Sequence, residues 1–267
     1  MVNRTSLMGV INITPDSFSD GGECLQPELA LKRASEQISQ GADVLDLGAQ
    51  STRPGAKEVG CHEELRRLIP AIQLIRQHHP KSTISVDTFL SEVAEAALDA
   101  GANWINDVSG GRRDQRMLRL IAEKKCRYVL MHSRGNSRSM EQLTDYSNVV
   151  TDVRDSLLKA TEKALKAGLS TSQLIWDPGL GFAKNNFQNL LLLQNLEAIC
   201  AENFPVLVGP SRKRFIGSVL DQPLANSRLM GTAAVVCRCV QAGVQMVRVH
   251  DVAAIKQTIR MASELWP

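Results

Sequence analysis

Three stretches of this chain share one pattern: QGADVLDLG at 40–48, DAGANWINDV at 99–108 and QAGVQMVRVH at 241–250. Each joins the end of a helix-like segment, a glycine, a polar residue and a short apolar run. Glycine is the residue that most readily adopts the left-handed conformation at a helix end. The apolar runs are continuous rather than alternating, as in parallel strands that are buried on both faces. The pattern therefore predicts a repeated unit of helix and strand.

This unit recurs along the whole chain. The predicted strands are 7–13, 43–48, 83–87, 104–108, 127–132, 174–178, 205–209 and 245–250. The predicted helices lie near 27–40, 62–78, 91–100, 114–125, 149–167, 187–201, 225–242 and 251–265. Eight such pairs predict an α/β fold, a single-domain (β/α)8 TIM barrel that covers residues 1–267. An open doubly wound sheet is the main alternative, and it is disfavoured because no G-x-G-x-x-G follows a strand.

The composition is that of an ordinary globular protein. Apolar residues make up 43% of the chain and charged residues 22%, which argues against disorder. The net charge of +3 is too close to balance to indicate a nucleic-acid partner. Apolar runs are interrupted within about ten residues, which is too short for a membrane span. The N-terminus shows no signal-peptide pattern and the six cysteines form no CxxC, so we expect a cytoplasmic protein with reduced thiols.

Polar side chains gather where the predicted strands end. In a parallel barrel, these ends and the loops after them form the active face. Any single Asp or Asn has an alternative use as a cap of the next helix. The interpretation that all of these residues are helix caps is disfavoured, since the helices after the third, fourth and sixth strands begin several residues later. The residues concerned are Asn12, Asp87, Asn106, Asp107, His132, Asp177, Arg248 and His250, with 211–214 after the seventh strand.

Three of these residues form a group of hydrogen-bond acceptors. Asp87, Asn106 and Asp177 above an apolar floor would bind a planar heterocycle rich in N–H donors, and Lys213 would contact its carbonyl or ring nitrogen. The alternative is a divalent metal cluster, because carboxylates and carbonyl oxygens suit Mg²⁺. The lysine would then be crowded by the cation, which favours the heterocycle.

A second group is cationic or rich in donors. It contains Arg53, Arg248 and His250, with Lys213 as a further candidate. Arginine presents a two-pronged donor to phosphate, so this group indicates an anionic, phosphorylated substrate. Arg248 is distinctive because it lies within the apolar run VRVH, where a charge requires a partner.

The loops after the predicted strands differ in length and composition. Those at 14–26 and 49–60 are long and rich in Ser, Thr, Asp, Gly and Pro, so we expect lids or binding loops, with solvated insertions as the alternative. Residues 134–148 have the composition of an ordinary mobile loop. The two glycines in 177–185 would let backbone approach a ligand.

Together these segments resemble one family. The motifs are MGVINITPDSFSDGG (8–22), STRPGA (51–56), SVDT (85–88), NDVSGG (106–111), DPGLGFAKN (177–185), GPSRKRFIG (209–217) and VRVHDV (247–252). In this order, they are similar to those of the dihydropteroate synthases. The resemblance implies a homodimeric (β/α)8 barrel that joins 6-hydroxymethyl-7,8-dihydropterin diphosphate to p-aminobenzoate. The implied products are 7,8-dihydropteroate and diphosphate, with Mg²⁺ as the assisting ion.

The resemblance also implies roles for individual residues. The pterin would be held by Asp87, Asn106, Met131, Asp177, Lys213 and Arg248, the last stacking on the ring. The p-aminobenzoate side would be formed by Phe18, Pro54, Phe182 and Lys213, and Thr52 and Arg53 would be substrate-binding residues on the second loop. Asn12 would help to bind Mg²⁺ and diphosphate, together with Arg248 and His250. The residues implied to carry the chemistry are Asp177, Lys213, Arg248 and His250.

The sequence departs from the family pattern at two places. Many relatives read GGESTRPG where this chain has GAQSTRPG, so a carboxylate is replaced by Gln50. Many also read SRKS where this chain has Arg214, which bears on how the carboxylate of p-aminobenzoate is bound. Two other functions remain as alternatives: a pterin-binding methyltransferase domain and a non-catalytic pterin-binding barrel.

Overall fold

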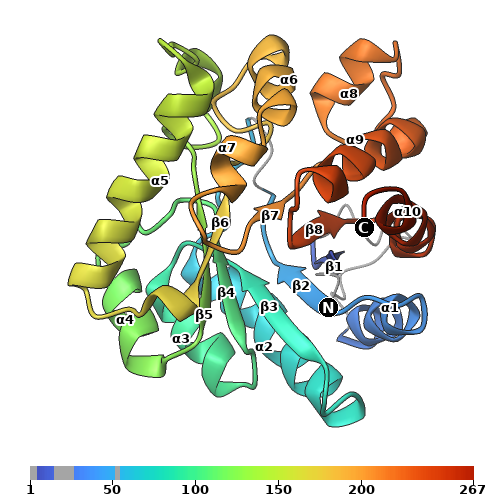
Figure 1. Ribbon diagram of the computed structural model, residues 1–267. Coiled ribbons are helices and arrows are strands. Elements are labelled where there is room, and N and C mark those ends of the chain that lie inside the picture. The colour runs from blue at the N-terminus through green and yellow to red at the C-terminus, as the bar shows by residue number, and fades with distance from the viewer. Residues whose placement is uncertain (1–4, 15–26, 52–54) are drawn as a thin grey trace.

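Eight parallel strands form the centre of the molecule (Figure 1). The computed structural model describes residues 5–14, 27–51 and 55–267. Its strands are β1 (Ser6–Asn12), β2 (Val44–Gly48), β3 (Thr83–Asp87), β4 (Trp104–Asp107), β5 (Arg127–Met131), β6 (Leu174–Asp177), β7 (Leu207–Val208) and β8 (Met246–Val249). The strand order is β6-β5-β4-β3-β2-β1-β8-β7, and a parallel bridge between Trp176 and Val206 joins the two outer strands. The predicted barrel is therefore confirmed.

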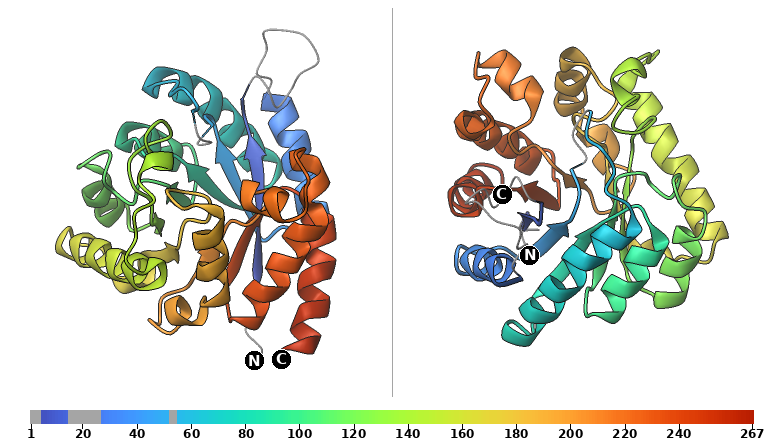
Figure 2. Two further views of the ribbon diagram at one scale, coloured as in Figure 1. Left: turned by 90° about the horizontal axis from the view of Figure 1, so that it is seen from above. Right: turned by 180° about the vertical axis from the view of Figure 1, so that it is seen from behind.

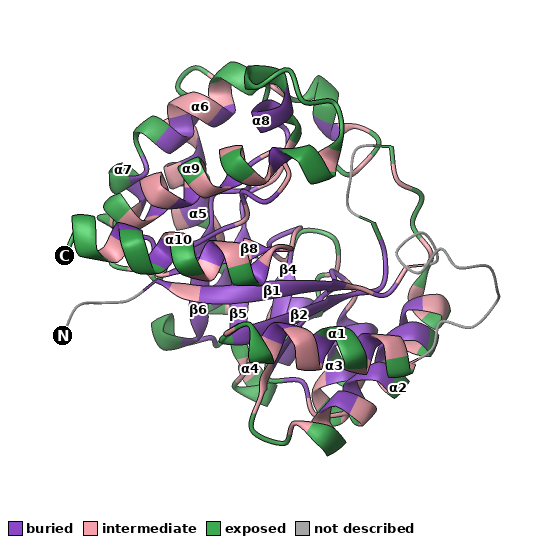
Figure 3. Ribbon diagram, turned by 90° about the vertical axis from the view of Figure 1, so that its right-hand side faces the viewer, coloured by how far each residue is buried: buried purple, intermediate pink, exposed green. Residues whose placement is uncertain are grey.

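Helices lie around the outside of the strands (Figure 2). They are α1 (Pro27–Ser39), α2 (Cys61–His78), α3 (Ser91–Asp99), α4 (Met117–Lys124), α5 (Val149–Lys166), α6 (Asn186–Gln194), α7 (Glu197–Cys200), α8 (Arg214–Val219), α9 (Leu229–Gln241) and α10 (Val252–Leu265). Their inward faces are buried with the strands and their outward faces are exposed (Figure 3). Within the described ranges, none of them has the length and apolar character that crossing a membrane requires.

Three helical segments differ from the prediction. The helix predicted at 187–201 is divided into α6 and α7, because Asn195 ends the first helix and its Nδ2 donates to Leu191 O at 2.8 Å. Asparagine side chains compete in this way with the backbone hydrogen bonds of a helix. Helix α8 was not predicted, since its six residues include Gly217 and are too few to show a helical period. A 3₁₀ turn at Ala225–Arg228 replaces the predicted start of the last but one helix.

The apolar core has two parts. The larger lies between the strands and the helices. The smaller fills the inside of the barrel and is contributed by β1, β2 and β5 to β8. Its members are Met8, Val44, Val129, Ile175, Leu207 and Met246, with Trp104 packed against them. This second cluster is the apolar floor on which the polar end of the barrel rests.

Trp176 secures the seam between β6 and β7. Its side chain is fully buried, stacks on Phe204 at 4.6 Å between ring centroids, and donates from Nε1 to Thr161 Oγ1 at 2.9 Å. Its backbone N–H donates to Pro205 O at 2.8 Å, across the seam. The junction between β6 and β7 therefore depends on one aromatic side chain as well as on a few backbone hydrogen bonds.

We expect Trp176→Ala to lower the free energy of unfolding by about 3–5 kcal/mol, because it leaves a large cavity beside the seam. Urea unfolding followed by circular dichroism measures this loss. Trp266→Ala is the matched control, since Trp266 is 38% exposed at the end of α10, and its effect should stay near 0.5 kcal/mol, roughly that of a surface change. Equal losses in the two variants would contradict the assigned role of Trp176.

Candidate active site

The side chains at the polar end of the barrel can be placed from the alternation of side chains along each strand. Side chains two positions apart along a strand point to the same face. Asp46, Met131, Asp177 and Arg248 each come two residues after a member of the apolar floor. Asn106 likewise comes two residues after Trp104, which packs against that floor. The strand geometry therefore directs these side chains into the mouth of the barrel.

Arg248 is the centre of this layer. Its Nε donates to Asp46 Oδ2 at 2.6 Å, and its second guanidinium nitrogen donates to Asp87 Oδ2 at 3.0 Å. Asn106 Nδ2 donates to the same Asp46 oxygen at 3.2 Å. Residues from β2, β3, β4 and β8 thus form one network, and the partner expected for a charge within VRVH is confirmed.

The network holds more carboxyl groups than its single guanidinium neutralises. Burial raises the pKa of Asp87 to about 7; Arg248 opposes this shift, and the charges of Asp46, Glu64 and Asp107 add to it. Asp46 is fully buried, and its Oδ1 has no hydrogen-bond partner in the described part of the chain. A ligand rich in N–H donors would stabilise such a group of acceptors.

Asp177 stands opposite, at the end of β6. One of its oxygens, Oδ1, accepts a 2.7 Å hydrogen bond from Gly179 N. Burial raises the pKa of Asp177 from its usual value, while Lys213, Lys184 and Arg248 oppose the shift. Met131 pairs with Asp177 in the register of β5 and β6 and is 5% exposed. Two further predicted residues also meet, since Lys213 Nζ lies 4.6 Å from the centroid of the Phe182 ring.

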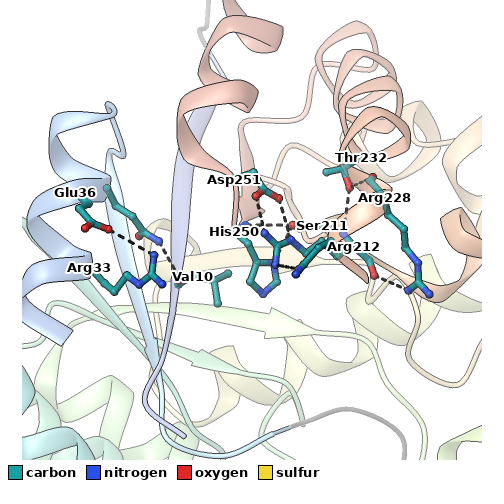
Figure 4. A network of polar contacts seen from close by, with 11 residues as sticks. Val10, Arg33, Glu36, Ser211, Arg212, Arg228, Thr232, His250 and Asp251 are labelled. Atoms are coloured by element: carbon teal, nitrogen blue, oxygen red, sulfur yellow. Dashed lines mark hydrogen bonds and ion pairs between the residues drawn. The ribbon is translucent and has the colours of Figure 1, made fainter. Parts of the chain in front are cut away.

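His250 lies in the loop after β8, next to Ser211 (Figure 4). Its Nδ1 is 2.9 Å from Ser211 Oγ, and its backbone N–H donates to the same hydroxyl at 3.2 Å. Beside it, Arg212 forms a two-pronged pair with Asp251, with N···O distances of 2.6 and 3.0 Å. Ser211 therefore fixes the orientation of the imidazole.

The remaining predicted residues fall into two groups. Asn12 is the last residue of β1, and its side chain lies beside Gly48. A Cβ added to Gly48 would lie 3.9 Å from Asn12 Oδ1 and 3.8 Å from Asp87 Oδ2, so both oxygens are close to this glycine. Asp107 acts as a local cap, accepting from Ser109 N, Gly111 N and Tyr128 OH. The described residues do not include Phe18, Thr52, Arg53 and Pro54.

Comparison with known proteins identifies the family. The model of the family described as "Pterin binding enzyme" matches residues 8–250. The dihydropteroate synthase of Synechocystis sp. is 46% identical over 98% of this chain and 91% of its own length. The chain belongs to the dihydropteroate synthase family.

Solved structures of this family have the same fold. The dihydropteroate synthase of Clostridium difficile, crystallised in the presence of pteroic acid, superposes with a TM-score of 0.93 at 37% identity, over 99% of this chain and 98% of that one. The Xanthomonas albilineans dihydropteroate synthase with 4-aminobenzoic acid gives 0.92 at 39% identity, over 99% and 94%. Both chains match over nearly their full length.

The two departures from the dihydropteroate synthase pattern have definite places in the structure. Gln50 is buried, and its Oε1 accepts from Val59 N at 3.4 Å, so it bonds within its own loop. Arg214 begins α8 and forms an ion pair with Glu141, in the loop after β5. That loop also binds residues 55 and 56 through Ser137, so it is tied to its neighbours rather than being an ordinary mobile loop.

Sequence reasoning missed three residues that shape this site. They are Asp46, Glu64 and Lys184. Asp46 carried a usable signal, because an acid inside the apolar run DVLDLG requires a cation just as Arg248 requires an anion. The others carried no such signal, since buried and exposed polar residues look alike outside an apolar run.

Glu64, on the first turn of α2, is a buried carboxyl behind the end of β3. Its Oε2 accepts a 2.8 Å hydrogen bond from Thr88 Oγ1, and Thr88 directly follows Asp87. Its Oε1 is buried without a hydrogen-bond partner among the described residues. Burial raises the pKa of Glu64 to about 7, and the Thr88 hydrogen bond opposes this shift.

Replacing this carboxyl should change how stability depends on pH. A carboxyl with a pKa of about 7 when folded, and about 4.3 when unfolded, stabilises the fold at low pH and loses that contribution as the pH rises through 7. Glu64→Gln should therefore flatten the decline in unfolding free energy between about pH 5 and pH 8, by up to about 1.4 kcal/mol per pH unit. Urea unfolding at several pH values measures this slope.

Glu63→Gln is the matched control on the same helix. Hydrogen bonds from Arg66 and then Arg67 lower the pKa of Glu63 to about 2. Its stabilising contribution is therefore complete above about pH 5, and losing it should shift stability equally across the range. The interpretation of Glu64 fails if Glu64→Gln keeps the slope of the wild type.

Proposed function

We propose that this enzyme joins 6-hydroxymethyl-7,8-dihydropterin diphosphate to p-aminobenzoate, producing 7,8-dihydropteroate and diphosphate in folate biosynthesis. The observation that carries the proposal is the layer of acceptors and donors above the apolar floor, centred on the contacts of Arg248 with Asp46 and Asp87. Relatives have been solved in the presence of pteroic acid, which contains both the pterin and the aminobenzoate part, and with 4-aminobenzoic acid, one of the two proposed substrates. The protein is a transferase.

The proposed binding roles follow the chemistry of each group. Asp87, Asn106 and Asp177 accept hydrogen bonds from the N–H groups of the pterin, while Met131 closes the apolar floor beneath the ring. The paired guanidinium of Arg248 stacks on the ring, since its plane is held by two carboxylates. Each acceptor is fixed before the substrate arrives, which lowers the cost of ordering the site.

The aryl amine is proposed to bind at the outer end of the pterin. Phe182 and Lys213 form one side of this subsite through their ring–ammonium contact. Its other side is assigned, from the family resemblance, to Phe18 and Pro54, with Thr52 and Arg53 as substrate-binding residues of the second loop.

The reaction is proposed to begin with loss of diphosphate. The C–O bond at the pterin methylene breaks, diphosphate leaves with the electron pair, and the cation is stabilised by the pterin ring. The amine nitrogen of p-aminobenzoate then forms the new C–N bond and releases one proton. Asp177 and its neighbouring acceptors stabilise positive charge on the pterin, and Arg248 and His250 stabilise the departing anion.

We also propose Mg²⁺ as the ion that assists departure of diphosphate. In the described residues, no group of three or more His, Cys, Asp or Glu side chains is placed to hold a metal. Asn12 Oδ1 at the end of β1 offers one neutral oxygen, which fits an ion that is bound mainly through phosphate oxygens. When bound, the ion would neutralise charge on the leaving group.

A turnover assay tests the proposed function. Diphosphate release should depend on Mg²⁺ and should require p-aminobenzoate, and a sulfonamide should compete with that substrate. Asp177→Asn should abolish pterin binding in calorimetry because an amide replaces a buried acceptor with a partial donor, whereas Asp99→Asn, exposed at the far end of α3, should bind normally.

Three outcomes of these assays would count against the proposal. Near-normal turnover of Asp177→Asn would refute its role. Methyl transfer from methyltetrahydrofolate, without diphosphate release, would favour the methyltransferase alternative. Tight pterin binding without turnover would favour the non-catalytic barrel.

A homodimer in the cytoplasm is the proposed form of the enzyme. Four exposed apolar side chains lie on α8, the turn after it and the start of α9, and they favour a contact with a second copy. They are Val219, Leu220, Leu224 and Met230. Five cysteines in the described ranges are free thiols, which suits a reducing compartment.

Met230→Glu should convert the dimer to a monomer in sedimentation velocity, because it places a charge in this apolar contact. Met261→Glu is the matched control: Met261 is 58% exposed, but it lies on α10, outside the patch. A monomeric wild type, or a Met230→Glu variant that stays dimeric, would rule out this surface.

A further inference from the structure

Lys184, in the loop after β6, is a buried cation with three acceptors. Its Nζ lies 3.0 Å from Gly179 O, 3.1 Å from Phe182 O and 3.0 Å from His132 Nδ1. The side chain belongs to a residue that is only 8% exposed. An ammonium has three N–H donors, so each donor of Lys184 has a partner. Two of these partners are carbonyls of the loop that carries Phe182.

The loop that Lys184 holds has a strained backbone. Gly179, Gly181 and Ala183 have φ angles of 70°, 78° and 47°, all in the left-handed region. A Cβ on Gly179 would lie 1.9 Å from His132 O, so the loop packs directly on the end of β5. Glycine adopts these angles readily, but an alanine such as Ala183 stays in this region only where surrounding contacts hold it. Contacts from outside the strained segment are therefore required to place Phe182.

Asn189 is a second clamp on the same loop, and it carries no charge. Its Oδ1 accepts from Gly181 N at 2.7 Å, and its Nδ2 donates to Lys184 O at 3.1 Å. The two clamps allow the mechanical role of Lys184 to be separated from its electrostatic role.

Gly179 also connects Lys184 with Asp177. Its carbonyl accepts from Lys184 Nζ at 3.0 Å, and its N–H donates to Asp177 Oδ1 at 2.7 Å. Lys184 is one of the positive charges that favour ionised Asp177, along with Lys213 and Arg248. The charges that act on Lys184 itself are Asp177, Arg134, Lys213 and Arg112.

We propose that Lys184 is a positioning residue with two effects: it holds the loop that presents Phe182, and its buried positive charge keeps Asp177 ionised for pterin binding. This inference rests on the proposed function, because it assigns Asp177 to the pterin. Burial lowers the pKa of Lys184 to about 7, so the ammonium is charged in the acid range where it has to act. Burial, followed by the charge of Lys184, lowers the pKa of His132 to about 2, so its ring stays neutral and accepts.

Three variants separate the two effects. Lys184→Met removes the charge and the clamp, Lys184→Arg keeps a charge, and Asn189→Ala loosens the same loop without changing any charge. Binding of 6-hydroxymethylpterin, which lacks the leaving group, is measured by calorimetry from about pH 5 to pH 8. The KM for p-aminobenzoate is measured in parallel at one pH.

The proposal predicts a different result for each variant. The acid limb is the fall in pterin affinity at low pH, as Asp177 becomes protonated. In Lys184→Met, this limb should move up by about one pH unit, which weakens binding about tenfold below it. Lys184→Arg and Asn189→Ala should keep the limb of the wild type. The charges that act on the pKa of Asp87 are those of Arg248, Asp46, Glu64 and Asp107, and none of these residues is changed. The contribution of Asp87 to the pH dependence of binding should therefore be the same in every variant. The KM for p-aminobenzoate should rise in both Lys184→Met and Asn189→Ala.

The proposal is overturned if Lys184→Met keeps the acid limb of the wild type, or if Lys184→Arg moves it equally. Lys184→Gln, which retains N–H donors without a charge, replaces Lys184→Met in the comparison if that variant does not fold. These results are distinct from failure of the proposed function, which would appear as absent turnover or absent pterin binding in the wild type.

Discussion

A guanidinium inside the barrel is the constraint on which the site depends. Arg248 projects from β8 above an apolar floor, where an unpaired charge would be strongly unfavourable. Asp46 and Asp87 supply the two carboxylates, at 2.6 and 3.0 Å, and they come from strands more than 160 residues away in sequence. This pairing orients Asn106 through Asp46 and fixes one plane across the mouth. The barrel is therefore closed around an ion network as well as around its apolar core.

The network leaves acceptors in excess, and this excess is the feature on which the proposed pterin site rests. Two carboxylates meet one guanidinium, a third buried carboxyl lies behind them at Glu64, and Asp177 faces them from β6. Burial, and then repulsion from the neighbouring acids, raises the pKa of Asp87 to about 7, so the site resists any further negative charge there. A ring that brings N–H donors relieves this repulsion without adding charge. Under the proposed function, selectivity for the heterocycle would thus arise from the same groups that bind Arg248.

The sequence predicted those parts of the site that periodicity and topology determine. The barrel followed from repeated glycine-to-strand units, and the strand-end positions of Asp87, Asn106 and Asp177 followed from parallel strands that all point one way. The need of Arg248 for a partner was predictable, but its identity depended on which strands are neighbours in space. Lys184 was beyond prediction, because its acceptors are two backbone carbonyls and a histidine from another loop.

The least regular part of the barrel lies beside the residues proposed to bind the aryl amine. Strand β7 has two residues, and it is joined to β6 by a single bridge at Trp176 and Val206. The loops that follow these two strands carry Phe182 and Lys213, so the sheet alone does little to fix their relative positions. Side-chain clamps replace the missing ladder: Lys184 and Asn189 hold the first loop, and Arg228 holds the second by donating to Arg212 O at 3.0 Å. A short seam of this kind leaves backbone free to shape a binding site, and buried polar contacts then determine that shape.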